Sequence, residues 1–162
     1  MSVRFASNSD IPAIIELLSQ VLDYHHQLRP DLFQAEGGKY SPQILEAILA
    51  NPDQPVFVYT DDRGQILGHI FLQIKTEVSP VKKPVKTLYI DDLCVAQKNR
   101  SSGIGQKLYN RAKSLAKKEG CYNLTLNVWE ANQGAVRFYE KLGFTTQQRQ
   151  MELILNDEPD SL

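Results

Sequence analysis

The spacing R-x-x-G-x-G joins an apolar segment to a segment of helical periodicity, through Arg100, Gly103 and Gly105. Glycines at the start of a helix leave several backbone N–H groups without side-chain cover, and the helix dipole makes that end positive. Neighbouring N–H groups exposed in this way bind anions, most naturally a diphosphate. A glycine in such a place can also serve only to turn the chain, so the spacing has to be compared with other anion-binding loops.

Two other glycine-loop chemistries are excluded by the spacing. The loop that binds nucleoside triphosphates needs G-x-x-x-x-G-K-[ST], whereas Gly105 is followed by Gln106, Lys107 and Leu108. The dinucleotide fingerprint G-x-G-x-x-G would place its third glycine at Leu108, and no acidic residue suits a ribose contact about 20 residues further on. The loop therefore predicts a diphosphate site of a different class.

Two adjacent carboxylates, Asp91 and Asp92, interrupt the apolar segment LYIDDLCV. Burying carboxylates is costly unless they have a partner or a chemical task. In a regular strand the two would face opposite sides, so that one can accept a proton, directly or through water, while the other makes a structural hydrogen bond. We favour Asp91 over Asp92 as the base, and a surface or capping role for both is the alternative.

The remaining chemical candidates are a short aromatic and histidine run and two cysteines. Tyr24, His25 and His26 come at the end of the predicted first helix, just after its apolar stripe, and a histidine can act as a base near neutral pH. No second set of ligands adjoins them, which argues against a metal site. Cys94 and Cys121 lack CxxC or Cys/His spacing, which argues against a disulfide framework and a zinc site. Cys94 is the one rival nucleophile, but no basic residue adjoins it in the sequence, and a neighbour in space is left open.

Composition narrows the class of protein. The chain has 162 residues, of which 42% are apolar, enough for one domain with a sizeable core and too few for two. Lys and Arg number 18 and Asp and Glu 19, so the net charge of −1 predicts no nucleic-acid partner and no attraction to an anionic membrane. The first ten residues lack the core of a signal peptide, and no apolar run approaches the roughly 20 residues of a membrane span. We expect a cytoplasmic protein.

Apolar periodicity predicts the elements that position these residues. The expected helices cover residues 11–22, 42–49 and 104–119, with a fourth that is capped by Asn132 and stopped by Gly143. The expected strands cover residues 3–5, 55–61, 66–77, 87–96, 124–128 and 144–155. Hairpin strands next to strand-helix-strand units predict an α/β fold (α+β by some schemes). Its mixed, mostly antiparallel central sheet has about six or seven strands and is flanked by about four helices.

Three motifs between about Thr87 and Phe144 resemble those of the GNAT superfamily of acetyl-CoA-dependent N-acetyltransferases. They are the strand LYIDDLCV, the loop RSSGIG and the block NQGAVRFYEKLGF, in the order that the family has them. The N-terminal helix, loop and hairpin also fit the layout of that family. One departure is Ser101, where many members carry a second glycine after the arginine, which reduces the tolerance of the loop for close approach.

The resemblance implies a site for acetyl-CoA. The amides of the loop would cradle the diphosphate of coenzyme A, and the strand before the loop would pair with the pantetheine arm. The implied cofactor-binding residues are Leu93, Cys94, Val95, Arg100, Ser101, Ser102, Gly103, Ile104, Gly105, Asn132 and Tyr139.

The resemblance also implies the catalytic groups. Tyr139 would give a proton to the departing thiolate, although a tyrosine beside Phe138 can equally be a core residue. The acidic pair resembles that of diamine and polyamine acetyltransferases, where it attracts and deprotonates a cationic amine. The run from Tyr24 to His26 falls in the region that lines the acceptor pocket of similar enzymes.

We therefore expect an N-acetyltransferase that transfers the acetyl group of acetyl-CoA directly to a primary amine in a ternary complex. The acceptor would be a small amine or polyamine, an amino acid or a peptide. The alternative is a non-catalytic module of the same fold that binds or senses coenzyme A. The expected GNAT domain covers residues 1–155, with a flexible tail at 156–162, and a homodimer is a common outcome among similar proteins.

Overall fold

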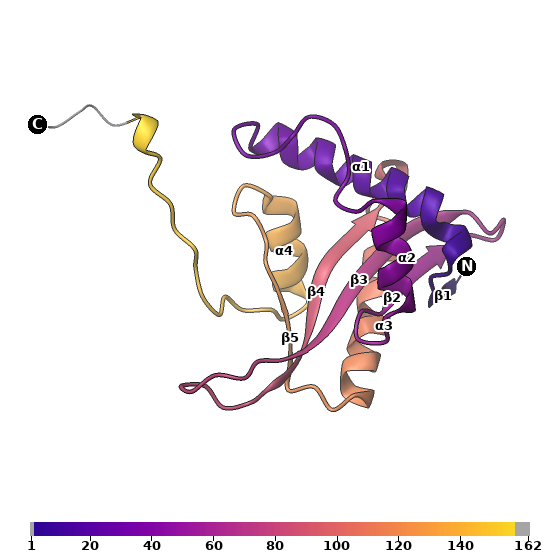
Figure 1. Cartoon of the computed structure of the whole chain (residues 1–162). Helices are drawn as coiled ribbons and strands as arrows, with labels where there is room; N and C mark the ends of the chain where they lie inside the picture. The colour runs from indigo at the N-terminus through magenta and orange to yellow at the C-terminus, as the bar shows by residue number, and fades with distance from the viewer. Residues whose placement is uncertain (1, 158–162) are drawn as a thin grey trace, which may run out of the picture. The chain divides into compact units, whose positions relative to one another are not determined.

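The chain forms two compact units that divide after Asn127. The computed structural model describes residues 2–157 (Figure 1), so the end of the expected tail, residues 158–162, lies outside the described residues. The first unit holds the strands β1 (Ser2–Phe5), β2 (Val56–Thr60), β3 (Ile66–Thr76), β4 (Lys86–Val95) and β5 (Asn123–Leu126), and the helices α1 (Ile11–Leu28), α2 (Pro42–Ala50) and α3 (Ile104–Lys118). The second unit holds α4 (Gln133–Lys141).

The five strands form one sheet in the order β1-β2-β3-β4-β5. The first four run antiparallel to their neighbours, and β5 runs parallel to β4. The mixed, mostly antiparallel sheet and the four α-helices found among residues 2–157 agree with the fold class predicted from the sequence.

The predicted number of strands is wrong, because residues 145–154 form no strand. A strand is stable when its backbone pairs with a neighbour and one of its faces is buried. Within the second unit the apolar side chains of this segment are exposed, including those of Met151, Leu153 and Ile154. The alternation in the sequence therefore predicted a strand, although this segment has neither a neighbouring strand nor a buried face in the described part of its unit.

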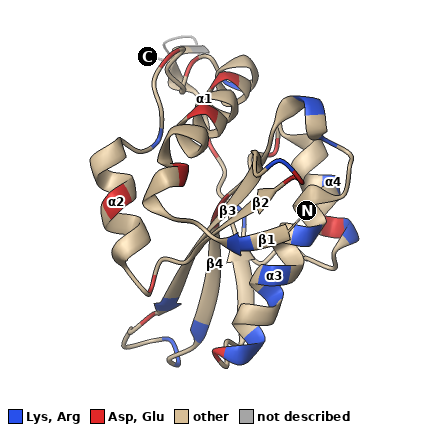
Figure 2. Ribbon diagram, turned by 90° about the vertical axis from the view of Figure 1, so that its right-hand side faces the viewer, with Lys and Arg blue, Asp and Glu red and all other residues tan. Residues whose placement is uncertain are grey.

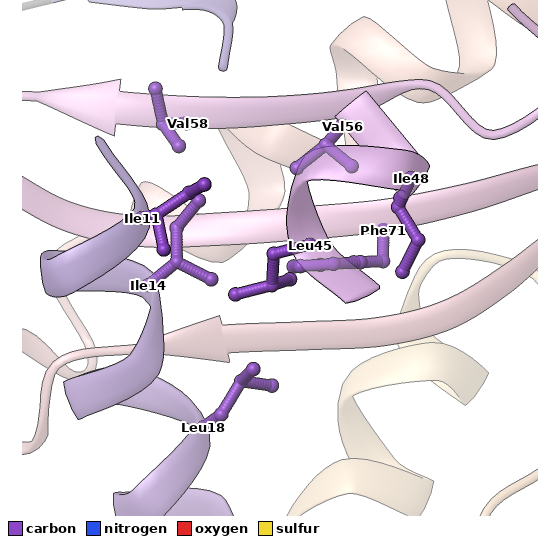
Figure 3. Close-up of a cluster of buried hydrophobic side chains, with 8 residues drawn as sticks. All are labelled: Ile11, Ile14, Leu18, Leu45, Ile48, Val56, Val58 and Phe71. Atoms are coloured by element: carbon purple, nitrogen blue, oxygen red, sulfur yellow. The ribbon is translucent and has the colours of Figure 1, made fainter. Parts of the chain in front are cut away.

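Helices α1 and α2 cover one face of the sheet, and α3 covers the other (Figure 2). The core on the first face is apolar and fully enclosed. Its side chains are contributed by α1, α2, β2 and β3 (Figure 3), and are those of Ile11, Ile14, Leu18, Leu45, Ile48, Val56, Val58 and Phe71. Spacings of three and four residues along α1 produce this stripe, as the sequence predicted.

Helix α3 packs on the opposite face through the stripe Ile104, Leu108, Ala112 and Ala116, all buried. It approaches β3 so closely that a methyl group added at Gly68 would lie 3.1 Å from the side chain of Leu108 and 3.2 Å from that of Ile104. The helix ends at Gly120, whose φ of 70° is a left-handed conformation that ends many helices. Its outer face carries exposed Lys and Arg side chains (Figure 2).

The second unit is organised around α4. The side chain of Asn132 accepts a hydrogen bond of 3.2 Å from the amide of Ala135 and so caps the helix, as predicted. Gly143, with a φ of 100°, follows its last turn. Within residues 2–157, no helix has the length and the apolar character needed to cross a membrane.

Candidate active site

Strands β4 and β5 pair along only part of β4. The parallel pairing runs from Thr87↔Asn123 to Ile90↔Leu126, and β5 then ends while β4 continues to Val95. Within residues 2–127, the β5-side edge of β4 therefore has no strand partner beyond Ile90. The expected cofactor-binding residues Leu93, Cys94 and Val95 lie on this stretch, which can accept an extended ligand by backbone hydrogen bonds.

The loop between β4 and α3 has a backbone shaped for an anion. Ser101 and Gly103 both have left-handed φ angles, of 66° and 85°, and Gly103 is the residue that precedes the first turn of α3. Among residues 2–157, the backbone N–H groups from Ser101 to Gly105 find no hydrogen-bond acceptor. The nearby hydroxyl of Ser102 donates instead to the carbonyl oxygen of Asn99.

Ser101 adopts a backbone conformation that is less favourable for serine than for glycine. A left-handed φ costs a serine of the order of 1 kcal/mol, whereas a glycine adopts it without steric penalty. The neighbouring Arg100 donates from Nε to the carbonyl oxygen of Val95 at 3.4 Å. Its guanidinium lies 5.7 Å from the centre of the Tyr24 ring, so the arginine connects the loop to α1.

The two carboxylates do not face opposite sides, because a β-bulge lies between them. Phe71 pairs with Asp92 and Leu72 pairs with Ile90, which leaves Asp91 as an extra residue on β4. A bulge re-aims a side chain and breaks the alternation of the strand. Both carboxylates consequently act on the same phenol, since Asp91 and Asp92 each raise the pKa of Tyr40.

Asp91 is held by the loop between α1 and α2. The hydroxyl of Tyr40 donates to its Oδ2 at 2.5 Å, and the ammonium of Lys39 lies 3.1 Å from its Oδ1. Lys39 also donates to the backbone oxygen of Asp91. Tyr40 in turn stacks on Phe71, with ring centres 5.6 Å apart. Both oxygens of this carboxylate are therefore occupied.

Asp92 is held by a histidine that the sequence analysis missed. The Oδ2 of Asp92 lies 2.6 Å from Nε2 of His69, which belongs to β3 and is fully buried. The two residues are 23 positions apart in the chain, so local spacing could not connect them. The available signal was a lone histidine in the otherwise apolar strand ILGHIFLQ.

The predicted acceptor residues Tyr24, His25 and His26 lie on the last turns of α1, which extends to Leu28. The ring of His25 packs at a tilt against that of Phe33, with centres 4.9 Å apart, and Nδ1 of His26 lies 2.9 Å from the carbonyl oxygen of Phe33. Burial lowers the pKa of His25, while the charge of Asp92 raises it and that of Lys39 lowers it. His25 therefore shares the electrostatic environment of the acidic pair.

Cys94 is poorly suited to be a nucleophile. Burial, followed by the charge of Asp92, raises the pKa of its thiol to about 12. The thiol lies 3.5 Å from the carbonyl oxygen of Leu17, to which it donates. His69 faces Cys94 in the strand register, yet its Nε2 is used by Asp92. The structure thus places a histidine near the thiol without a hydrogen bond between them.

Asn132 and Tyr139, the remaining predicted cofactor residues, lie in the second unit. Asn132 uses its side chain as the helix cap, and Tyr139 is half-buried on α4. The Tyr139 ring meets those of Phe138 and Phe144 edge to face, with centres 5.1 and 5.5 Å apart. Within its own unit, Tyr139 therefore belongs to an aromatic cluster.

Comparison with known proteins decides the family. The sequence profile described as Acetyltransferase (GNAT) family matches residues 20–144, which is more than half of the chain. The chain belongs to this family. The GNAT assignment agrees with the three motifs of the sequence, and it makes the protein an acyltransferase.

Two GNAT relatives and one solved structure illustrate the likeness. YhfO of Bacillus subtilis, an uncharacterized N-acetyltransferase, is 32% identical over 145 residues, which cover 89% of each chain. Glucosamine 6-phosphate N-acetyltransferase of Trypanosoma brucei brucei is 32% identical over 155 residues, which cover 96% of each chain. The crystal structure of a tetramutant of BH1408 from Bacillus halodurans has a TM-score of 0.91 and 30% identity, and covers 96% of this chain and 100% of that one.

Proposed function

We propose that this GNAT protein transfers the acetyl group of acetyl-CoA directly to a primary amine, in a complex that holds both substrates. The acceptor is a small amine or polyamine, an amino acid or a peptide. The relative from Trypanosoma brucei brucei that is named for acetylating glucosamine 6-phosphate supports an acceptor of the amine class. In this proposal the transferase domain covers residues 1–155.

The observation that carries the proposal is the row of unpaired amides from Ser101 to Gly105. They occur where α3 begins, so the helix dipole adds to the attraction for an anion. The left-handed residues Ser101 and Gly103 turn successive N–H groups toward one concave point, which suits a diphosphate. Ser102 and Ile104 supply further amides to this row of N–H groups, and Arg100 directly precedes it in the sequence.

The open edge of β4 supports a place for the pantetheine arm. An extended chain with amide groups can pair with the backbone of Leu93 to Val95 as an added strand would. This stretch leads directly from the acidic pair to the anion-binding loop. Cofactor and acceptor would then meet at the bulge of β4.

The acidic pair supports a cationic acceptor. Asp91 and Asp92 bring two carboxylates into one half-buried cluster, and only one ammonium, that of Lys39, makes an ion pair with them among residues 2–157. The local surplus of negative charge attracts an ammonium group, and a carboxylate can then remove its proton. Tyr24, His25 and His26 would border the acceptor pocket.

Direct transfer is favoured over a covalent intermediate on Cys94. A thiol with a pKa raised to about 12 is almost entirely protonated near neutral pH, and its hydrogen bond to Leu17 leaves it without a base. In the proposed route Tyr139 protonates the departing thiolate, and Asn132 contributes to the cofactor end of the site.

Thiol release tests the function. Purified protein is mixed with acetyl-CoA and, in turn, with polyamines, amino acids, aminoglycosides and peptides, while free thiol is followed. We expect acceptor-dependent release with at least one amine, together with an acetylated product of matching mass. Tight binding of coenzyme A with no release on any acceptor would favour the alternative, a binding or sensing module.

A further inference from the structure

His69 is an ionisable side chain in the apolar interior of the sheet. It lies in the middle of β3, its exposed fraction is 0%, and its ring meets Phe71 edge to face at 4.9 Å. Among residues 2–157 its side chain makes one hydrogen bond, that between Nε2 and Asp92. Nδ1 is buried and has no partner in the described part of the chain.

This environment selects one form of the ring. A proton on Nδ1 would be a buried donor without an acceptor, which is unfavourable. The tautomer with its proton on Nε2 avoids that cost and donates to Oδ2 of Asp92. The short distance of 2.6 Å is that of a donor facing a charged carboxylate.

The two carboxylates differ in whether one of their oxygens is still available to accept a hydrogen bond. Asp91 has a partner on each of its oxygens, Tyr40 on one and Lys39 on the other. Asp92 uses only Oδ2, and its Oδ1 accepts no hydrogen bond within residues 2–157. The Asp92 side chain is 12% exposed, enough for contact with a ligand. Asp92 is therefore the carboxylate with a free acceptor atom.

We propose that His69 is a positioning residue that holds Asp92 ionised and oriented, and that Asp92 rather than Asp91 accepts the proton of the acceptor amine. This inference rests on the proposed function. It replaces our preference for Asp91, which in this account fastens the loop of Lys39 and Tyr40 to the bulge.

The proton transfer balances as follows. Oδ1 of Asp92 removes one proton from the ammonium group of the acceptor and leaves a neutral amine. The lone pair of that amine forms the N–C bond with the thioester carbonyl, and the C–S bond then breaks with its electron pair on sulfur. Tyr139, the proposed acid, gives a proton to the thiolate, and the second proton of the nitrogen restores the Tyr139 hydroxyl through water. Asp92 returns its proton to water, so one proton is released in all.

Other ionisable groups face Asp92 and set its surroundings. The charge of Asp92 acts on His25 of α1, on Tyr40 of the loop, and on Cys94 of its own strand. Asp91 and the ammonium of Lys39 belong to the same cluster. His69 is the one among them that donates a hydrogen bond to Asp92, so removing its donor affects the carboxylate.

Nitrogen-15 NMR on histidine-labelled wild-type protein tests the geometry without any activity. We expect one histidine to carry its proton on Nε2 and to disappear from the spectrum of His69→Gln. A ring that carries its proton on Nδ1 would overturn the inference. This arm does not depend on the acceptor or on the cofactor.

Kinetics test the positioning role with two amides of different reach. The nitrogen of Gln can occupy the place of Nε2, whereas that of Asn reaches only the place of Nδ1. We expect His69→Gln to stay close to wild type in kcat/KM for the amine. We expect His69→Asn to lose about 10- to 100-fold, as when a hydrogen-bond partner that orients a metal-ligating side chain is removed. The KM for acetyl-CoA should not change in either variant.

The pH profile separates positioning from mere packing. Without a donor the charged carboxylate is less favoured, so the acidic limb of kcat/KM should move to higher pH in His69→Asn and not in His69→Gln. Ile70→Val, which trims a buried side chain on the opposite face of β3, is the packing control and should leave the limb in place.

The outcomes distinguish the two proposals. Equal losses of kcat/KM in His69→Gln and His69→Asn, with the acidic limb of the pH profile unmoved, would mean that His69 has only a structural role. That result would contradict the inference about His69 and leave the proposed function standing. Absence of thiol release by wild-type protein with every amine would contradict the proposed function instead. If His69→Asn does not fold, His69→Gln still decides, since a large loss of its kcat/KM in a folded protein contradicts the positioning role.

Discussion

The hydroxyl of Tyr40 donates a hydrogen bond to Oδ2 of Asp91 and so joins a loop to a strand residue 51 positions away in the chain. Replacing Tyr40 by Phe removes this bond and keeps the ring that stacks on Phe71. Hydrogen bonds to charged groups contribute about 1.5–3 kcal/mol, so we expect a loss of that size in the free energy of unfolding, measured with urea. Tyr122→Phe, at an exposed tyrosine, is the matched control and should change little.

The same bond predicts a dependence on alkaline pH. Burial and, next, the hydrogen bond to Asp91 raise the pKa of Tyr40 above its ordinary value of 10.0. Because the pKa of Tyr40 is raised in the folded state, its contribution to the free energy of unfolding is complete below pH 10 and is lost as the pH rises above that value. The difference in unfolding free energy between wild type and Tyr40→Phe should therefore shrink above pH 10. A constant difference from pH 8 to pH 11 would contradict this contact.

Tyr139→Phe tests the proposed acid. Removing the hydroxyl keeps the edge-to-face ring contacts with Phe138 and Phe144, so the fold of α4 should persist. General acid groups contribute roughly 10²- to 10⁴-fold, and we expect turnover to fall within that range. The affinity for coenzyme A should stay within error in calorimetry. Unchanged turnover would remove Tyr139 from the mechanism and leave it as an aromatic core residue.

Gly68→Ala tests the close packing around Gly68 of β3, where the backbone of β4 and the side chains of α3 both approach it. The added methyl group would lie 2.9 Å from the carbonyl oxygen of Cys94 and 3.1 Å from the side chain of Leu108. Because a backbone oxygen cannot yield as a flexible side chain does, we expect a destabilisation of about 1–3 kcal/mol in denaturant unfolding. Gly38→Ala is the control, since no atom lies within 4 Å of the added group. Equal stability of the two variants would contradict the close packing.

Asp10→Asn tests the junction before α1. Asp10 accepts two hydrogen bonds from Arg4, at 2.8 and 3.0 Å, and one from the amide of Ser7 at 2.8 Å. The Arg4 hydrogen bond is the largest cause that lowers the pKa of Asp10 below its ordinary value of 3.8. Because the pKa of Asp10 is lowered in the folded state, its contribution to the free energy of unfolding is complete above about pH 4 and is lost as the pH falls through the folded-state pKa.

We expect Asp10→Asn to lose about 1–2 kcal/mol at pH 7. Its disadvantage relative to wild type should decrease as the pH is lowered below 4. Thermal unfolding from pH 2 to pH 7 measures both effects, and Asp53→Asn, at an exposed aspartate, serves as control. A disadvantage that persists unchanged at pH 2 would contradict the ion pair with Arg4.

Local periodicity was sufficient for most elements of the fold. The stripes of α1 and α3 and the cap at Asn132 follow from spacings of three or four residues, which the sequence displays directly. The end of α1 was predicted too early, because the polar run through Tyr24 and His26 resembles a loop. The helix continues to Leu28, and Pro30 is the first residue beyond it that a helix interior does not tolerate.

The candidate site was predicted only where its signal is local. The loop between β4 and α3 is continuous in sequence, so the placement of Ser101 and Gly103 just before a helix was predictable. The bulge at Asp91 was not, because it depends on how β4 pairs with β3. The partners His69 and Tyr40 come from elements 23 and 51 residues away from their carboxylates, and no spacing rule reaches them.

Titration calorimetry of coenzyme A against Gly103→Ala tests the central claim most directly. Gly103 has a φ of 85° and no atom within 4 Å of an added methyl group, and Gly64→Ala, with a φ of 78° and equally open space, matches its backbone strain away from the loop. We predict that wild type and Gly64→Ala bind coenzyme A with equal affinity. Gly103→Ala should bind it at least about 10-fold more weakly, which corresponds to a loss of about 1.4 kcal/mol of binding free energy. Pantetheine, which lacks the diphosphate, should bind all three proteins equally. Equal affinity of Gly103→Ala and Gly64→Ala for coenzyme A, or no binding by the folded wild type, would contradict the claim that these amides hold the diphosphate.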